Sequence, residues 1–136
     1  MPVRADTYSV EKFVQMVTTT ASRADARHIA KAVVKRRLAA CVQVVGPIES
    51  TFRWLDKVET AREWLCLMKT TQARYRELVT AVEAIHPYDT PEIIALPIAA
   101  GSRRYLDWLA SSVRPPTTNR KSAIGNRKSS RGSSCC

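Results

Sequence analysis

The sequence predicts an α+β domain in which strands and helices follow one another in the order β-α-β-β-α-β, with a further helix towards the C-terminal end. Three observations carry this prediction. The 136 residues fit one domain with a tail. The composition, 45% hydrophobic and 25% charged, is that of a globular protein with a core. Along the chain, apolar residues recur alternately at strand spacing and at helix spacing.

The sequence up to residue 54 predicts a strand, a helix and the first arm of a hairpin. Residues 7–20 include several β-branched side chains, which favour a strand. Ser22 is a favourable N-cap for the helix that follows. Residues 40–54 form the second strand, which Gly46 and Pro47 bend or bulge. The helix between the two strands carries an outward-facing basic stripe of Arg23, Arg27, Lys31 and Lys35.

The second half predicts the other arm of the hairpin, a helix, a strand and a last helix. The first of these helices begins at Thr71 or Gln72 and ends at His86, because the residue before a proline avoids helical geometry. The complete order is the split βαβ, or ferredoxin-like, pattern, with two helices on one face of one antiparallel sheet. The predicted turn, third strand, fourth strand and C-terminal helix cover residues 55–57, 58–71, 92–98 and 102–112.

The charge divides the chain near residue 113. The net charge is +10, and the segment from Ser111 onward holds six basic residues and no acidic one. Pro115 and Pro116 oppose a helix there, and the rest of the segment is of low complexity. We therefore expect one domain over residues 1–113 and a disordered basic tail over residues 114–136, in which Cys135 and Cys136 are exposed.

Three predicted strand segments are apolar on both faces. An antiparallel strand with one solvated face alternates polar and apolar residues, and these segments do not. Two helices cover only one face of the sheet, so a monomer would expose a large apolar patch. We therefore expect a homo-oligomer that forms through the helix-free face. The segments are residues 40–45, 64–68 and 93–96.

Several classes of protein are disfavoured. No apolar run approaches the length of a membrane-spanning helix, and the N-terminus lacks the apolar core of a secretory signal. The sequence motifs of phosphate-binding loops, zinc proteases and serine hydrolases are missing. We expect no membrane partner, no organic cofactor and no enzymatic activity, and contact with nucleic acid only through the basic tail.

His86 is the most suggestive side chain for chemistry. Imidazole is the commonest metal ligand, and the two prolines that follow His86 stiffen the next loop. Asp89 and Glu92 on that loop offer carboxylate oxygens that could ligate a metal or orient the ring. The alternative is a histidine that only caps the helix.

Three further side chains, Cys41, Trp54 and Lys69, are candidates for a site, and Cys66 is expected to belong to the core. Cys41 and Cys66 lie in apolar runs and are expected to be buried free thiols, which indicates a reducing compartment. Cys41 is also a candidate thiolate ligand. Trp54, near the hairpin turn, either packs or caps a pocket. Lys69 ends an apolar strand and requires a cleft or a polar partner.

Five segments, in this order along the chain, resemble the CutA family of divalent-cation tolerance proteins. The resemblance covers about residues 10–112 and leaves out the tail. The segments are Arg37-Leu38-Ala39-Ala40-Cys41-Val42, Ser50-Thr51-Phe52-Arg53-Trp54 with Lys57-Val58-Glu59, residues 63–71, residues 86–93, and Tyr105-Leu106-Asp107-Trp108-Leu109.

This resemblance implies a compact cytoplasmic homotrimer, similar to the PII signalling proteins, that is associated with copper and other divalent cations. Some family members have a cysteine on the first strand near the metal, whereas the matching stretch here is Val17-Thr18-Thr19. His86 is then the main candidate ligand. The resemblance also implies an inter-subunit cleft for a small ligand. We assign to that cleft Trp54, Lys69, Tyr88 and Cys41, beside the metal candidates His86, Asp89 and Glu92.

Three functions follow, in order of preference. The first is a trimeric, non-enzymatic protein that binds divalent metal, copper foremost. The second is a PII-like signalling or scaffold module that binds a small effector in the inter-subunit cleft. The third is an enzyme in which Lys69 and His86 act as acid and base across a subunit boundary.

Overall fold

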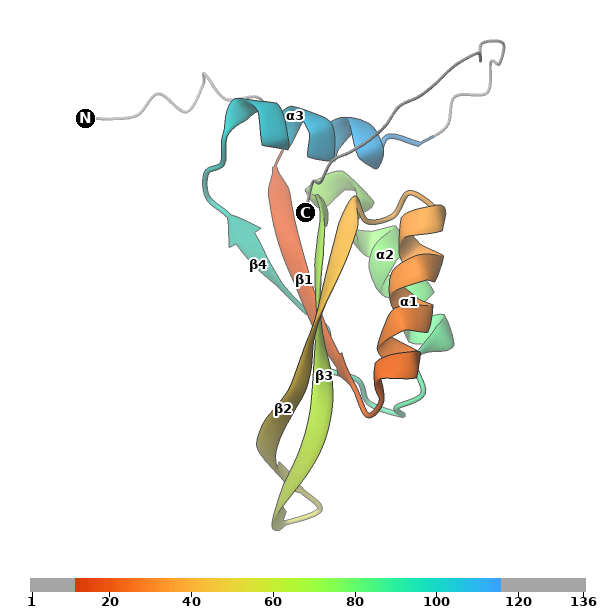
Figure 1. Cartoon of the computed structure of the whole chain (residues 1–136), viewed down its shortest axis with the longest axis vertical. Helices are drawn as coiled ribbons and strands as arrows, with labels where there is room; N and C mark the ends of the chain where they lie inside the picture. The colour runs from red at the N-terminus through yellow and green to blue at the C-terminus, as the bar shows by residue number, and fades with distance from the viewer. Residues whose placement is uncertain (1–11, 116–136) are drawn as a thin grey trace, which may run out of the picture.

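A computed structural model describes residues 12–115 of the chain (Figure 1). It confirms the order β-α-β-β-α-β followed by a C-terminal helix. The predicted tail lies outside the described residues from residue 116 onward, as do the first residues of the predicted first strand. The elements are β1 (Phe13–Thr20), α1 (Arg23–Lys35), β2 (Cys41–Trp54), β3 (Lys57–Thr71), α2 (Gln72–Ile85), β4 (Ile94–Ile98) and α3 (Arg103–Ser112).

The four strands form one antiparallel sheet in the order β2-β3-β1-β4, which is the ferredoxin-like arrangement. Figure 1 shows α1 and α2 on the same side of the sheet, while α3 lies across one end of it. Among the described residues, the other side of the sheet meets a helix only at one end, where α3 packs near Phe13 and Cys41; it is called the helix-free face below. Sequence order alone predicts this two-layer arrangement, because each strand-helix-strand crossover places its helix on the same face.

Capping residues fix where two of the helices begin. The Ser22 hydroxyl accepts a hydrogen bond from the backbone N–H of Asp25 at 3.0 Å, so the predicted N-cap of α1 is confirmed. Ser102 caps α3 in the same way through the N–H of Tyr105. The helix α2 ends at Ile85, and its C-cap His86 has the extended backbone (φ −73°, ψ 134°) that a following proline favours.

Strands β2 and β3 form a long hairpin that extends beyond the body of the subunit (Figure 1). Its turn is the two residues Leu55 and Asp56, with φ of 50° and 67°, values that match the right-handed twist of a hairpin. The predicted three-residue turn is therefore one residue too long, because Lys57 already pairs with Trp54. A shift of register between Val45 and Ile48 confirms the predicted irregularity at Gly46 and Pro47.

Strand β4 begins at Ile94, two residues later than predicted. Its pairing with β1 ends at Val17 opposite Ile94. Further along β1, the carbonyl oxygen of Thr19 bonds to the ring of His86 instead. The loop before β4 is thus held by a side chain rather than by the sheet.

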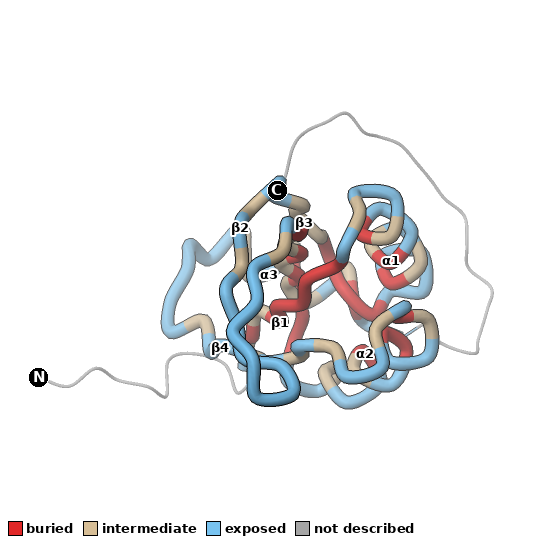
Figure 2. The backbone as a smooth tube through the Cα atoms, turned by 90° about the horizontal axis from the view of Figure 1, so that it is seen from below, coloured by how far each residue is buried: buried red, intermediate tan, exposed pale blue. Residues whose placement is uncertain are grey.

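The main core lies between the sheet and the helices α1 and α2. Figure 2 shows buried backbone along β1 and on the inner turns of both helices, and exposed backbone on their outer turns. Cys66 is completely buried, as predicted, and Cys41 is buried as well. The largest side chains of this core with no exposed area are Met16, Ile29, Met68 and Leu78, while Leu109, equally buried, belongs to a smaller cluster with Ala40 and Val113. No helix within residues 12–115 is long and apolar enough to cross a membrane.

The helix-free face of the sheet is apolar and open in the single subunit. The strand register places Val45, Leu65 and Leu67 on this face of β2 and β3, since partners in the register share a face. Ile94 and Leu96 of β4 lie on the same face, opposite Val17 and Gln15 of β1. The two-sided apolar character predicted for these strands is therefore confirmed. On the helix-free face, the exposed fraction of Val45 is 46%, that of Ile94 is 47% and that of Leu96 is 48%.

Candidate functional site

His86 is buried where α2 meets the end of β1. Its Nδ1 accepts a hydrogen bond from the backbone N–H of Tyr88 at 3.1 Å. Its Nε2 lies 2.9 Å from the carbonyl oxygen of Thr19. Since a carbonyl only accepts, Nε2 carries the proton and donates it, which makes His86 a neutral imidazole of defined tautomer. Burial lowers the pKa of His86, and this outweighs the backbone hydrogen bond to Thr19, which acts in the opposite direction.

Tyr88 connects the same loop to β3. Its hydroxyl donates a hydrogen bond of 2.6 Å to Oε2 of Glu63, and its ring lies 5.0 Å from the ring of His86. Burial raises the pKa of Tyr88, and the hydrogen bond to Glu63 adds to the effect. Glu63 is only 8% exposed, so the tyrosine hydroxyl compensates for the burial of its carboxylate.

The other two predicted metal ligands lie apart from this cluster. Asp89 and Glu92 are both exposed on the loop between α2 and β4. Within residues 12–115, neither carboxylate forms a hydrogen bond or ion pair with His86, whose two ring nitrogens are already used. Residues 12–115 contain no group of three or more His, Cys, Asp or Glu side chains that could hold a metal ion. One subunit therefore does not supply a complete metal site from its described residues.

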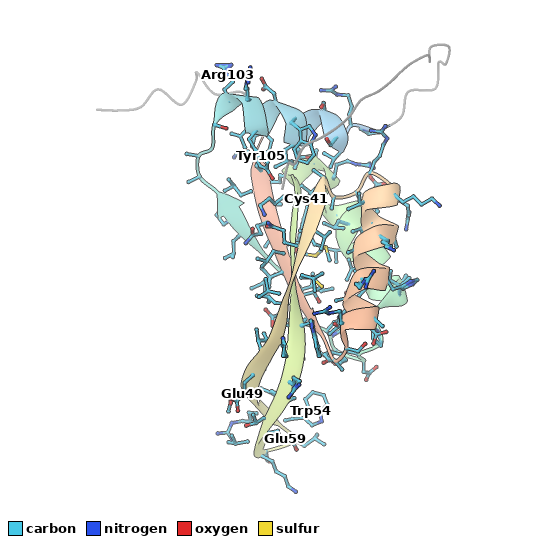
Figure 3. All side chains as sticks on the ribbon, viewed as in Figure 1. Cys41, Glu49, Trp54, Glu59, Arg103 and Tyr105 are labelled. Carbon is cyan, nitrogen blue, oxygen red and sulfur yellow. The ribbon has the colours of Figure 1, made fainter. Side chains whose placement is uncertain are left out.

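A second polar cluster lies at the end of the sheet that α3 covers. Cys41 on β2 and Lys69 on β3 are cross-strand partners on the helix-free face. Nζ of Lys69 donates a hydrogen bond of 2.6 Å to Oε1 of Gln43, so this lysine has the polar partner that its apolar strand required. Sγ of Cys41 lies 3.8 Å from the hydroxyl of Tyr105 on α3. In Figure 3, Cys41 and Tyr105 lie near each other, at the end of the sheet beside α3.

Trp54 lies far from both clusters. It is the last residue of β2, at the tip of the hairpin, and it is 49% exposed. Figure 3 places Trp54 at the opposite end of the hairpin from Cys41. Tyr88 contacts β3 at Glu63, on a different stretch of the sheet from Lys69. The residues assigned to one cleft thus occupy three separate places in a single subunit.

Sequence reasoning missed Glu63, Gln43 and Tyr105. A position on the hairpin predicts a solvated charge for Glu63, and the helical spacing of Tyr105 predicts packing alone. The alternation of side chains along β3 could have indicated that Glu63 is not simply solvated. Positions 63, 65, 67 and 69 lie on the same face of the strand, and this is the apolar helix-free face. No local pattern pairs Glu63 with Tyr88, which is 25 residues away.

The fold and these clusters define a ferredoxin-like subunit with one uncovered sheet face. Residues 14–112 match the family model described as CutA1 divalent ion tolerance protein. The divalent-cation tolerance protein CutA of Thermus thermophilus is 50% identical over 94 residues, which are 69% of this chain and 91% of that protein. The chain therefore belongs to the CutA1 divalent ion tolerance family.

Solved structures agree with this assignment. The structure of the divalent cation tolerance protein from Thermus thermophilus has a TM-score of 0.72 and 47% identity, over 77% of this chain and all of that one. The structure described as the periplasmic divalent cation tolerance protein CutA from Archaeoglobus fulgidus has a TM-score of 0.73 and 37% identity, over 75% of this chain and 99% of that one.

Proposed function

We propose that this protein is a non-enzymatic homotrimer that binds divalent cations, copper foremost. Membership of a divalent ion tolerance family supports the cation, and the apolar helix-free face supports the assembly. The observation that carries the proposal is that face. A surface on which Val45, Ile94 and Leu96 are each nearly half exposed is stable in water when other copies cover it.

The proposed cation site is completed between copies. A divalent transition metal needs several nitrogen, oxygen or sulfur ligands, and the described part of one subunit lacks such a group. Asp89 and Glu92 are the candidate oxygen ligands because they are exposed on one short loop. His86 joins them only if its ring gives up the hydrogen bond to Thr19 or to Tyr88. Its neutral form is the one that binds metal.

Titration calorimetry with Cu²⁺ and with Zn²⁺ tests the site. The background is the full chain with Cys135 and Cys136, which lie outside the described residues, replaced by serine, because thiols capture soft metals. We expect Asp89→Asn with Glu92→Gln to weaken cation binding about tenfold or more. The matched control, Glu83→Gln with Asp107→Asn, removes two exposed carboxylates from helices elsewhere and leaves the affinity unchanged.

Three outcomes would contradict the proposal or one part of it. Equal affinity of the loop variant and the matched control would remove Asp89 and Glu92 from the site. Absence of cation binding in the unsubstituted chain would refute cation binding itself. Full binding by His86→Gln would show that the histidine serves the fold rather than the metal.

The proposed compartment is the cytoplasm, and the supporting observation is the pair of free, buried thiols Cys41 and Cys66. Cell fractionation tests this location, since one solved relative is described as periplasmic. The alternative is a PII-like module that binds a small effector between subunits. No contact among residues 12–115 favours it. A thermal-shift screen in which a metabolite, and no metal, stabilised the protein would favour that alternative instead.

A further inference from the structure

The positive charge of the folded body is concentrated on one helix and the turn after it. Residues 23–37 hold six Arg or Lys and one Asp, a net charge of +5. The other described residues hold ten basic and nine acidic side chains, so they are nearly neutral. This asymmetry gives the α1 side of the subunit a positive field.

The charges follow one line along α1. Four basic side chains recur every fourth residue, so they form a stripe about 18 Å long at a rise of about 1.5 Å per residue. All four are exposed, and none forms an ion pair with any residue that the structure describes. Asp25, the single acidic residue of α1, sits in its first turn beside the N-cap. The stripe consists of Arg23, Arg27, Lys31 and Lys35.

An apolar groove runs beside this stripe, between α1 and β2. The groove is shallow and open, and it is lined by the apolar residues Ala30, Val34 and Val42, called its floor here, and by Lys31 and Lys35. Val34 is 40% exposed, although the neighbouring turns of α1 bury their apolar residues in the core. The groove thus combines a small apolar floor with two ammonium groups that no described carboxylate neutralises.

We propose that this groove docks an acidic amphipathic helix of a partner protein. The apolar stripe of such a helix covers Ala30, Val34 and Val42, and its carboxylates reach Lys31 and Lys35. The groove lies on the helix-covered side of the sheet, so an assembly through the helix-free face leaves it open. The inference is independent of the proposed cation binding, which uses other residues.

Two other polyanions fit the surface less well. A nucleic-acid backbone would use the basic stripe but would leave the apolar floor in water. A membrane surface needs an apolar helix face that can insert, and the apolar face of α1 is buried in the core through Ala26, Ile29 and Val33. An acidic amphipathic helix uses both the floor and the charges.

A labelled synthetic peptide serves as the probe in fluorescence anisotropy with the full chain. It has about 14 residues, which match the length of α1, with leucines at helical spacing and glutamates beside them. We expect binding that weakens between about 50 and 300 mM salt. We expect Lys31→Glu with Lys35→Glu to weaken it about tenfold or more, and Val34→Ser to weaken it several-fold.

The matched control is Arg103→Glu with Arg104→Glu, which makes the same change of charge on the exposed surface of α3. This control retains the affinity of the unsubstituted chain. Far-ultraviolet circular dichroism verifies that all variants are folded. Amide exchange shows added protection over residues 30–42 when the peptide is bound.

Several results would overturn the inference. One is equal binding of a peptide with the same composition but a broken apolar stripe, and another is an equal effect of the α3 control. Tighter binding of a single-stranded oligonucleotide or of anionic vesicles, lost in the Lys31→Glu, Lys35→Glu variant, would assign the stripe to those partners. Absence of peptide binding would refute the groove as a docking site.

Discussion

At the scale of single residues, His86 joins two parts of the chain that are distant in sequence. Its ring bonds to Thr19 on one side and to the backbone of Tyr88 on the other, and both bonds are available to the neutral imidazole. Burial lowers its pKa below the ordinary value of 6.5. As the pH falls below that value, the unfolded chain takes up a proton that the folded chain resists, and stability is lost.

The first prediction concerns this pH dependence. Between about pH 7.5 and about pH 5.5, the melting temperature of the unsubstituted protein falls more than that of His86→Gln. The control is His28→Gln, which removes the only other histidine, an exposed residue on α1, and keeps the dependence of the parent. Calorimetric scans at fixed protein concentration measure the difference. Parallel curves for the parent and His86→Gln would contradict the role given to the ring.

The second prediction concerns Glu63 and Tyr88. Replacing Tyr88 with Phe leaves the buried Glu63 carboxylate without its donor, and we expect a loss of about 1.5–3 kcal/mol in the free energy of unfolding. The control is Tyr75→Phe, since the Tyr75 hydroxyl has no hydrogen bond to any residue from 12 to 115. Urea titrations measure both changes. Equal losses in the two variants would show that the Tyr88 hydroxyl contributes nothing specific.

At the scale of elements, the hairpin depends on a close approach at its bulge. Gly46 sits where β2 shifts register, and the ring of Trp64 on β3 lies against its α-carbon. A Cβ atom at position 46 would fall 2.7 Å from Cγ and 2.8 Å from Nε1 of Trp64. Trp64 also packs against the main core, so its ring has little room to move.

The third prediction follows from that contact. We expect Gly46→Ala to lower the free energy of unfolding by about 1–3 kcal/mol, because the indole ring must shift. Gly101→Ala is the matched control, since its Cβ would meet only the side chain of Leu106, with the nearest atom at 3.0 Å. Urea titration of both variants gives the comparison. A larger loss at Gly101 would contradict the packing argument.

At the scale of the whole molecule, the two faces of the sheet differ in their environment. One face is closed by α1 and α2, and the other exposes apolar side chains of β2, β3 and β4. Covering those side chains stabilises an assembly at about 25 cal/mol for each Å² of apolar surface removed from water.

The fourth prediction tests that assembly. We expect the protein to have three times the subunit mass of 15.2 kDa, and Leu96→Glu to reduce it to a single subunit, because a carboxylate on the helix-free face opposes burial. Val34→Glu also replaces an exposed apolar residue, but on the helix-covered side, and leaves the mass unchanged. Light scattering after gel filtration measures the mass. A stable 15.2 kDa species in the unsubstituted protein would refute the assembly.

Local signals were sufficient for most of the elements. Ser22 before a helical pattern, Pro87 after one, and Gly46 with Pro47 inside a strand each act on the backbone within a few residues. The start of β4 was misplaced for the opposite reason. It follows from the pairing of β4 with β1, which begins at Ile94 opposite Val17, two residues far apart in the sequence.

The sequence by itself determined the order of the elements, the family and the two-sided apolar strands, because periodicity and capping depend on neighbouring residues. Only the tertiary structure decided which polar side chains meet. Tyr88 reaches Glu63, Lys69 pairs with Gln43, and Trp54 stands apart at the tip of the hairpin. Such contacts depend on the register of the strands and on the path of the loops. These bring together residues that are far apart in the sequence and that no local sequence pattern relates.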